Sequence, residues 1–362
     1  MEARPLEGIK VLDFTTLLPG PLATLILAEA GAEVVKIERP GGEDLRRYPP
    51  FIGKASAPFV LLNRGKICRE VDLKDEKAHE VLIPLIEEAD VLVEQFRPGV
   101  MERLGLGFEN VRKINPRLIY CSITGYGQIG VRAGEAGHDI NYLALTGLLA
   151  LSHGSSEHPA LPPTQIADIG GGSFPAVMNI LLALLQRERT GKGVRLDIAM
   201  ADAMFTFAVF AHAELAATGK APQNGKALLS GASPRYQLYF ASDGEAIAVG
   251  ALEQKFWIAF CDAIGLPEHL RNDSVNPAAT MDAVRNIISS RSRAEWEPVL
   301  AEADCCATPV KTLAEAMNDP HFLERGLFDH EVAGLTKAVA AAVVPVEPQF
   351  RTSPGNARTR RS

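Results

Sequence analysis

The feature that most constrains the fold is a strand-helix-strand pattern near the start of the chain. Residues 9–14 read IKVLDF, an apolar strand, and residues 20–31 read GPLATLILAEAG, a helix with proline in its first turn. Residues 32–38 read AEVVKIE, a second strand. Strands joined through a helix pair in parallel, and helices must cover a parallel sheet. The pattern predicts an α/β fold on an open parallel sheet.

The pattern continues with a helix over 75–89 and strands over 90–96 and 116–124, and three long apolar helical stretches follow, the middle one closed by Gly191 and Gly193. From about residue 220 the chain alternates in polarity. Asp243 and Gly244 predict a hairpin turn there, and helices are expected around 254–264 and 294–303. We therefore expect a smaller α+β domain in this part of the chain.

Composition excludes several classes of function. The net charge of −7 and pI near 5.7 give no basic surface for nucleic acid. We see no signal peptide and no apolar run of about 18–20 residues, the length that spans a bilayer, so we expect no membrane contact and a cytoplasmic protein. The odd number of cysteines, 5, and the absence of a C-x-x-C pair favour free thiols in a reducing compartment.

Two motifs suggest ligand-binding or metal sites that their sequence context does not support. Residues 125–130, GYGQIG, match the dinucleotide fingerprint G-x-G-x-x-G, but glycine-rich loop follows them where the fingerprint needs a helix. We expect a loop that lets the backbone approach a ligand closely. His153 and His158 have no third ligand of compatible type nearby, so no metal site is expected.

The candidate catalytic residues are His138, Asp168 and Glu253. His138 lies in AGHDINYLALTG, between glycines and an apolar helix, and Asp168 lies in ADIGGG just before a long helix. A loop histidine and a helix N-cap are the simpler interpretations of the first two. A histidine and a carboxylate that both precede buried helices can, however, converge in one pocket. Glu253 follows an apolar strand and carries little weight alone.

The chain resembles the class III CoA-transferases (the CaiB/BaiF type) and, within them, the α-methylacyl-CoA racemases. The resemblance covers nearly the whole chain, through strings such as GIKVLDFTTLLPGPLATLILAEAGAEVVKIERPGGED, ADVLVEQFRPGVMERLGLG, NPRLIYCSITGYGQIG, AGHDINYLALTG and SDGEAIAVGALEQKFW. It implies an interlocked homodimer whose chains each have a large Rossmann-like lobe and a small α+β lobe. The expected parts are a large CoA-binding domain over 1–200, a linker helix over 201–224, a small domain over 225–315, and a segment over 316–362 that returns to the large domain.

The resemblance also implies an acyl-CoA thioester as substrate, with no cofactor besides. The residues that match the family's CoA contacts are Arg39, Lys74, Gln95, Phe96 and Arg103. Arginine suits this role because it offers a forked set of donors to phosphate and a flat face to adenine. A surface salt bridge is the simpler interpretation for each charged member.

The histidine of GHDINY separates two implied reactions. Racemases use this histidine, His138, and the aspartate, Asp168, as an acid/base pair, with Glu253 accepting a hydrogen bond from the histidine. Backbone N–H groups around Asp168 and the GGG that follows it would hold the enolate oxygen. Transferases generally lack the histidine and use the aspartate as a nucleophile. The resemblance thus implies racemisation of 2-methylacyl-CoA, with CoA transfer through Asp168 as the alternative. Arg235 departs from the usual aromatic or small residue, which predicts an altered acyl pocket.

Overall fold

The computed structural model describes residues 4–332, 339–351 and 360–361. The chain divides into two compact units, which we treat separately. Unit 1 consists of Met1–Thr146, Pro162–Phe207 and Pro320–Ser362, and unit 2 consists of Gly147–Leu161 and Ala208–Asp319. The predicted linker helix over 201–224 is instead two short helices, α8 (Met204–Phe207) and α9 (Val209–Thr218), and the boundary between the units falls between them.

Unit 1 is built on a seven-stranded sheet in which every neighbouring pair is parallel. Its strands, in chain order, are β1 (Lys10–Phe14), β2 (Glu33–Glu38), β5 (Ile67–Glu70), β6 (Val91–Glu94), β7 (Ile119–Thr124), β8 (Arg195–Ala199) and β14 (Arg360–Arg361). Their order across the sheet is β14-β5-β2-β1-β6-β7-β8. Apart from β14, this is the strand order of doubly wound dinucleotide-binding sheets. The predicted α/β fold on a parallel sheet is confirmed.

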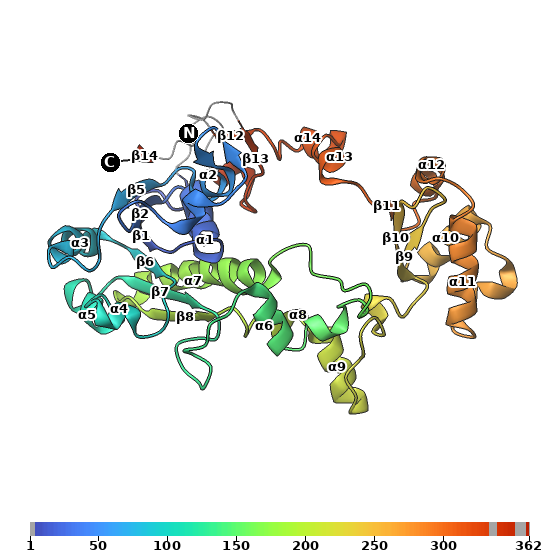
Figure 1. Ribbon diagram of the computed structural model, residues 1–362, viewed down its shortest axis with the longest axis horizontal. Coiled ribbons are helices and arrows are strands. Elements are labelled where there is room, and N and C mark those ends of the chain that lie inside the picture. The colour runs from blue at the N-terminus through green and yellow to red at the C-terminus, as the bar shows by residue number, and fades with distance from the viewer. Residues whose placement is uncertain (1–3, 333–338, 352–359, 362) are drawn as a thin grey trace. The chain divides into compact units, whose positions relative to one another are not determined.

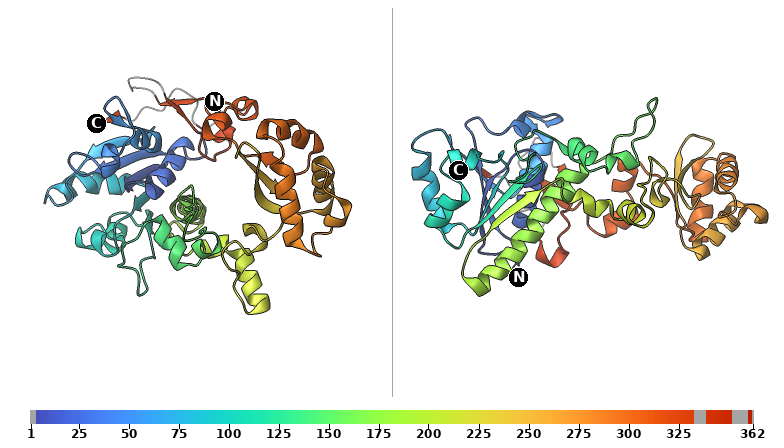
Figure 2. Two further views of the ribbon diagram at one scale, coloured as in Figure 1. Left: turned by 45° about the vertical axis from the view of Figure 1, so that its right-hand side comes forward. Right: turned by 90° about the horizontal axis from the view of Figure 1, so that it is seen from below.

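Helices cover both faces of this sheet (Figure 1). On one side lie α3 (Ala78–Glu88), α4 (Val100–Arg103) and α5 (Phe108–Ile114); on the other lie α1 (Pro19–Glu29) and α7 (Phe174–Thr190), and Figure 2 shows α7 running along the sheet. Phe14 packs with Leu82 of α3 and Val111 of α5 in a buried cluster. The other elements of unit 1 are α2 (Ala57–Asn63), α6 (Asp139–Leu145), α14 (Pro320–Glu324), β3 (Phe51–Ile52), β4 (Ala55–Ser56), β12 (His330–Val332) and β13 (Val339–Ala341).

Unit 2 contains a three-stranded antiparallel sheet, in the order β11-β10-β9. Its strands are β9 (Tyr236–Phe240), β10 (Ala246–Gly250) and β11 (Ala307–Pro309), and its helices besides α9 are α10 (Gln254–Ile264), α11 (Pro277–Ile288), α12 (Arg293–Ala303) and α13 (Leu313–Met317). Trp257, Phe260 and Trp296 are buried at the centre of its core. The predicted hairpin and the helices at 254–264 and 294–303 are confirmed, whereas α11 was not predicted.

The sequence analysis was wrong about long apolar runs. The helical stretch Ala167–Thr190 is long and apolar enough to cross a membrane by length and composition, although the core helix of a soluble protein passes the same test. Within α7, the side chains of Met178, Leu182 and Leu185 are exposed. Among the described residues of unit 1, nothing covers this apolar face of the helix.

Candidate active site

A pocket of about 380 Å³ opens in unit 1 where the sheet order reverses, beside the carboxyl ends of β1 and β6. Loops that follow neighbouring parallel strands diverge at this point because their connections run to opposite sides, and ligands bind in the crevice that results. The pocket is lined by Leu17 and Pro19 after β1, by 95–98 after β6, and by Gly125 after β7. His138 and Asp168 line it from the other side.

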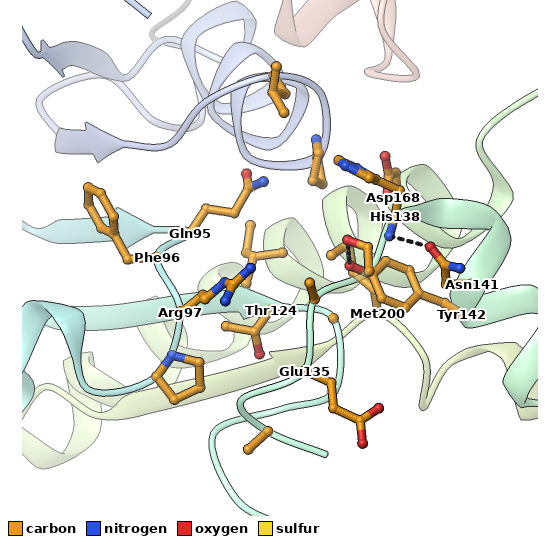
Figure 3. Close-up of a pocket in the computed structure, with 18 residues that line it drawn as sticks. Gln95, Phe96, Arg97, Thr124, Glu135, His138, Asn141, Tyr142, Asp168 and Met200 are labelled. Atoms are coloured by element: carbon orange, nitrogen blue, oxygen red, sulfur yellow. Dashed lines mark hydrogen bonds between the residues drawn. The ribbon is translucent and has the colours of Figure 1, made fainter. Parts of the chain in front are cut away.

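The structure brings His138 and Asp168 together, and Figure 3 shows the two side chains next to each other. His138 precedes α6, and its backbone N–H donates to Oδ1 of Asn141 over 3.0 Å. Asp168 is the second residue of a π-helical segment, Ala167–Ser173, that leads into α7. The N-cap of this segment is Ile166, so Asp168 lies close to the helix N-terminus, as the simpler interpretation expected, but is not the cap itself. π-Helical turns inside α-helices occur often at functional sites because they displace side chains from the regular ladder.

The glycines around the pair permit close packing of protein on protein. A Cβ on Gly125 would lie 2.5 Å from the ring of the buried Tyr142, and one on Gly137 would lie 2.7 Å from it. The Tyr142 hydroxyl donates to the Gly137 carbonyl over 2.6 Å. A Cβ on Gly171 would lie 2.3 Å from the Met200 carbonyl oxygen. GYGQIG is followed by loop, as predicted, and the surroundings of Gly125 and Gly137 explain why glycine is needed on both sides of the pocket.

Asp139, which the sequence analysis missed, connects the start of α6 to the start of the π-helical segment. Its Oδ1 accepts hydrogen bonds from the backbone N–H groups of Ala167 over 2.7 Å and Asp168 over 3.0 Å. Both are first-turn donors that the helix itself leaves unpaired. The predicted use of backbone N–H groups around Asp168 for an enolate oxygen is therefore wrong for these two groups, because Asp139 already occupies them. The adjacency of Asp139 to His138 was the available signal.

The surroundings of Asp168 raise its pKa to about 6. Burial is the main cause, because it disfavours the charged carboxylate, and the negative charge of Asp139 acts in the same direction. His138 opposes both by favouring the ionised form. Asp168 can thus exist in both protonation states near neutral pH, as proton transfer requires.

A buried ion cluster holds the loop that forms the opposite wall of the pocket. Asp13, Lys36 and Lys66 are fully buried, with Lys66 Nζ 3.2 Å from Asp13 Oδ2 and Lys36 Nζ donating to the Thr15 carbonyl over 2.6 Å. The next residues of the loop include Leu17, which lines the pocket at a φ of 62°, a left-handed conformation unusual for leucine. The network of charges and hydroxyls holds this strained loop in place.

A second pocket, of about 320 Å³, contains three of the five predicted CoA contacts. Arg39, Lys74 and Phe96 line it together with apolar side chains such as Ile37 and Leu104. Phe96 lines the first pocket as well, so the two pockets share a wall. Arg39 is exposed and also forms a surface ion pair with Asp44, the simpler interpretation considered for it, and exposed pairs of this kind are weak.

The remaining predicted site residues are Gln95, Arg103 and Glu253. Gln95 lines the first pocket, where its Oε1 accepts the N–H of Gly20 over 3.1 Å, so it also caps the start of α1. Arg103 ends α4, is exposed, and lines neither pocket. Glu253 lies in unit 2, exposed, directly before α10. Neither unit by itself unites Glu253 with His138.

Arg235 is committed to the packing of unit 2. Its guanidinium donates to both carboxylate oxygens of Asp273, over 2.9 and 2.6 Å, and lies over the ring of Trp257. A bidentate pair of this kind fixes the arginine in place, since two parallel hydrogen bonds define its orientation. Arg235 thus has a structural explanation within its own unit.

Known proteins resemble the chain over almost its full length. The family model for CoA-transferase family III matches residues 6–361. Human α-methylacyl-CoA racemase is 35% identical over 96% of this chain and 90% of its own. Acetyl-CoA:oxalate CoA-transferase of Acetobacter aceti is 36% identical over 89% of this chain and 85% of its own. The crystal structure of a CaiB/BaiF family protein from Brucella suis superposes with a TM-score of 0.84 at 29% identity, covering 99% of this chain and 96% of that one. This chain therefore belongs to CoA-transferase family III.

Proposed function

We propose that this protein is an α-methylacyl-CoA racemase that interconverts (R)- and (S)-2-methylacyl-CoA. The observation that carries the proposal is that His138 and Asp168 line one pocket, with the pKa of Asp168 raised to about 6. Racemisation needs one group on each face of the α-carbon, one to remove a proton and one to deliver it. The similarity to human α-methylacyl-CoA racemase supports the same reaction.

In the proposed mechanism neutral His138 removes the α-proton, and the electron pair of the broken C–H bond moves into the thioester to form an enolate. Protonated Asp168 then delivers a proton to the opposite face of the same carbon. The roles reverse for the other enantiomer, so no proton is gained or lost overall. The buried hydroxyl of Thr124 also lines the pocket and has no hydrogen-bond partner within the described part of the chain, which leaves it available to a bound substrate.

The shared wall of the two pockets supports a path for CoA. The adenosine end would lie among the apolar side chains of the second pocket, with Arg39 and Lys74 near the phosphates. The pantetheine arm would pass Phe96, and the thioester would reach His138 and Asp168. Guanidinium and ammonium groups favour this assignment because they form charge-assisted hydrogen bonds to phosphate.

The proposal includes a homodimer of interlocked chains in the cytoplasm, in which Glu253 accepts a hydrogen bond from His138. The exposed apolar face of α7 supports a second copy as its cover. Monomeric proteins rarely leave a contiguous apolar patch of this kind open to water. Sedimentation equilibrium tests the dimer, and a monomer at micromolar concentration would contradict it.

CoA transfer is the second candidate function, because acetyl-CoA:oxalate CoA-transferase is as similar in sequence as the racemase. In that reaction the Asp168 carboxylate attacks the acyl-CoA carbonyl, CoA thiolate leaves, and an acyl anhydride forms; the thiolate then attacks the aspartyl carbonyl and releases the carboxylic acid. The resulting aspartyl-CoA thioester passes CoA to a second acid. This reaction gives His138 no required role.

The deciding experiment incubates one enantiomer of a 2-methylacyl-CoA with the protein in deuterated water. Loss of the α-proton signal together with racemisation, both strongly reduced in His138→Ala, is the expected result. If the α-proton persists while CoA moves to an added carboxylate, and a CoA adduct maps to Asp168, the protein is a transferase and the racemase proposal fails.

A further inference from the structure

Asp139 holds an unusual position for a residue that neither reaction scheme uses. It follows His138 directly in the chain, and its carboxylate accepts hydrogen bonds from the N–H groups of Ala167 and Asp168, 28 and 29 residues away. The start of α6 and the start of the π-helical segment are therefore joined through one side chain.

The charge of Asp139 has a second consequence. A helix N-terminus alone would favour an ionised carboxylate on Asp168, because the exposed N–H groups there carry partial positive charge. Asp139 accepts two of those N–H groups and adds a negative charge beside Asp168, and both effects favour the protonated acid. The charged or titratable groups beside Asp168 are Asp139, His138 and the Tyr142 hydroxyl.

We propose that Asp139 is a positioning residue, whose carboxylate ties the segment that carries Asp168 to the segment that carries His138 and places a negative charge beside Asp168. This inference rests on the proposed function, since a proton donor is what racemisation demands of Asp168. A plain structural cap would need only an acceptor atom at this place, whereas the proposed role needs the charge as well.

Asp139→Asn separates the two roles, because asparagine keeps an oxygen that accepts both N–H groups and removes the charge. We expect the pKa of Asp168 to fall in this variant. At pH values above that pKa, each unit of decrease reduces the protonated fraction, and with it the rate of the step that uses the acid, about tenfold. KM should change little. Asp139→Ala removes the acceptor too and should reduce kcat further.

The titration is read directly, without catalysis, from the carboxyl carbon of Asp168 by ¹³C NMR of protein labelled at aspartate, with the signal assigned by its absence in Asp168→Asn. The matched control is Asp197→Asn, because Asp197 also accepts a backbone N–H, from Gln128 over 2.9 Å, and does not face Asp168. An unchanged titration of Asp168 in Asp139→Asn would overturn the proposal and leave Asp139 as a structural cap. Failure of the racemase proposal would instead appear as absent α-proton exchange in the wild type, whatever the titration shows.

Discussion

Asp13 and Asp168 are carboxylates of the same unit in opposite electrostatic surroundings. Asp13 is fully buried between Lys36 and Lys66, and although burial alone would raise its pKa, these two cations and the hydroxyls of Thr15 and Thr24 hold it well below the usual range. Asp168 has no cationic lysine or arginine among the groups that shift its pKa, and Asp139 adds a like charge.

The difference shows how the same fold keeps one carboxylate ionised for structural support and leaves another able to titrate. Removing a charge from water is unfavourable unless an opposite charge and hydrogen bonds compensate for it, so the compensated carboxylate stays ionised and holds its neighbours in place. The carboxylate that is left uncompensated titrates near neutral pH instead, and such groups cluster at functional sites. The Asp13 cluster fixes the pocket wall around Leu17, and Asp168 places in the same pocket a carboxyl group whose pKa is raised to about 6.

The largest expected effect is on catalysis. His138→Ala and Asp168→Asn should each reduce α-proton exchange by about 10²–10⁴-fold, the usual contribution of a general acid or base. The control is Glu135→Gln, because Glu135 lines the same pocket but is paired with Arg132 over 2.8 Å. Exchange measured by NMR should stay close to wild type in this control. Equal losses in all three variants would mean that the pair has no special role.

The Asp13 cluster should show its effect in stability. Asp13→Ala leaves buried Lys66 without its ion-pair partner, whereas Lys36 keeps Glu43 at 3.0 Å. Breaking a buried pair in this way typically lowers the free energy of unfolding by about 3–5 kcal/mol. Urea unfolding measures this quantity. Glu88→Ala breaks the exposed pair with Lys10 and should leave the unfolding curve unchanged. If both variants unfold alike, the buried cluster is not the structural element that we infer.

The two carboxylates should also give opposite dependences of stability on pH. The pKa of Asp168 is raised by folding, so its contribution is complete below about pH 4 and is lost as the pH rises through about 6. Asp168→Asn should therefore gain about 1–2 kcal/mol over wild type between pH 4 and pH 8, after allowance for solvent screening. The pKa of Asp13 is lowered, so its contribution is present above pH 4 and lost on acidification. Urea unfolding between pH 4 and pH 8 measures the free energy of unfolding of Asp168→Asn and of wild type. If the difference between the two does not change with pH, the prediction for Asp168 is contradicted.

The smallest effect is expected at the second pocket. Lys74→Ala should raise KM for acyl-CoA by about three- to fivefold with little change in kcat, because one exposed charge contributes modestly. Arg103→Ala is the comparison, since Arg103 lines neither pocket and should change KM less. Steady-state kinetics at low ionic strength measure KM and kcat for both variants. The reverse order would place the CoA phosphates nearer α4.

Much of the fold could be predicted because its signals are local. The run IKVLDF, the proline-initiated helix and the strand AEVVKIE match β1, α1 and β2 within a residue or two, since hydrophobic periodicity and terminal residues act within a few positions. α11 was missed although its signals were also local: Asn276 caps it, Pro277 begins it, and Thr280, Val284 and Ile288 recur at helical spacing on its buried face.

The site residues likewise differ in whether local sequence could predict them. His138 and Asp168 were identified from the sequence because their motifs are continuous strings, and the structure then placed them in one pocket. The Asp13–Lys66 pair and the Asp139 cap could not be predicted, since their partners lie 53 and 28 residues away. Residue type and local pattern follow from the chain itself. Which carboxylate stays charged and which carries a proton is decided only by tertiary structure, because a pKa depends on burial and on neighbouring charges that folding brings together.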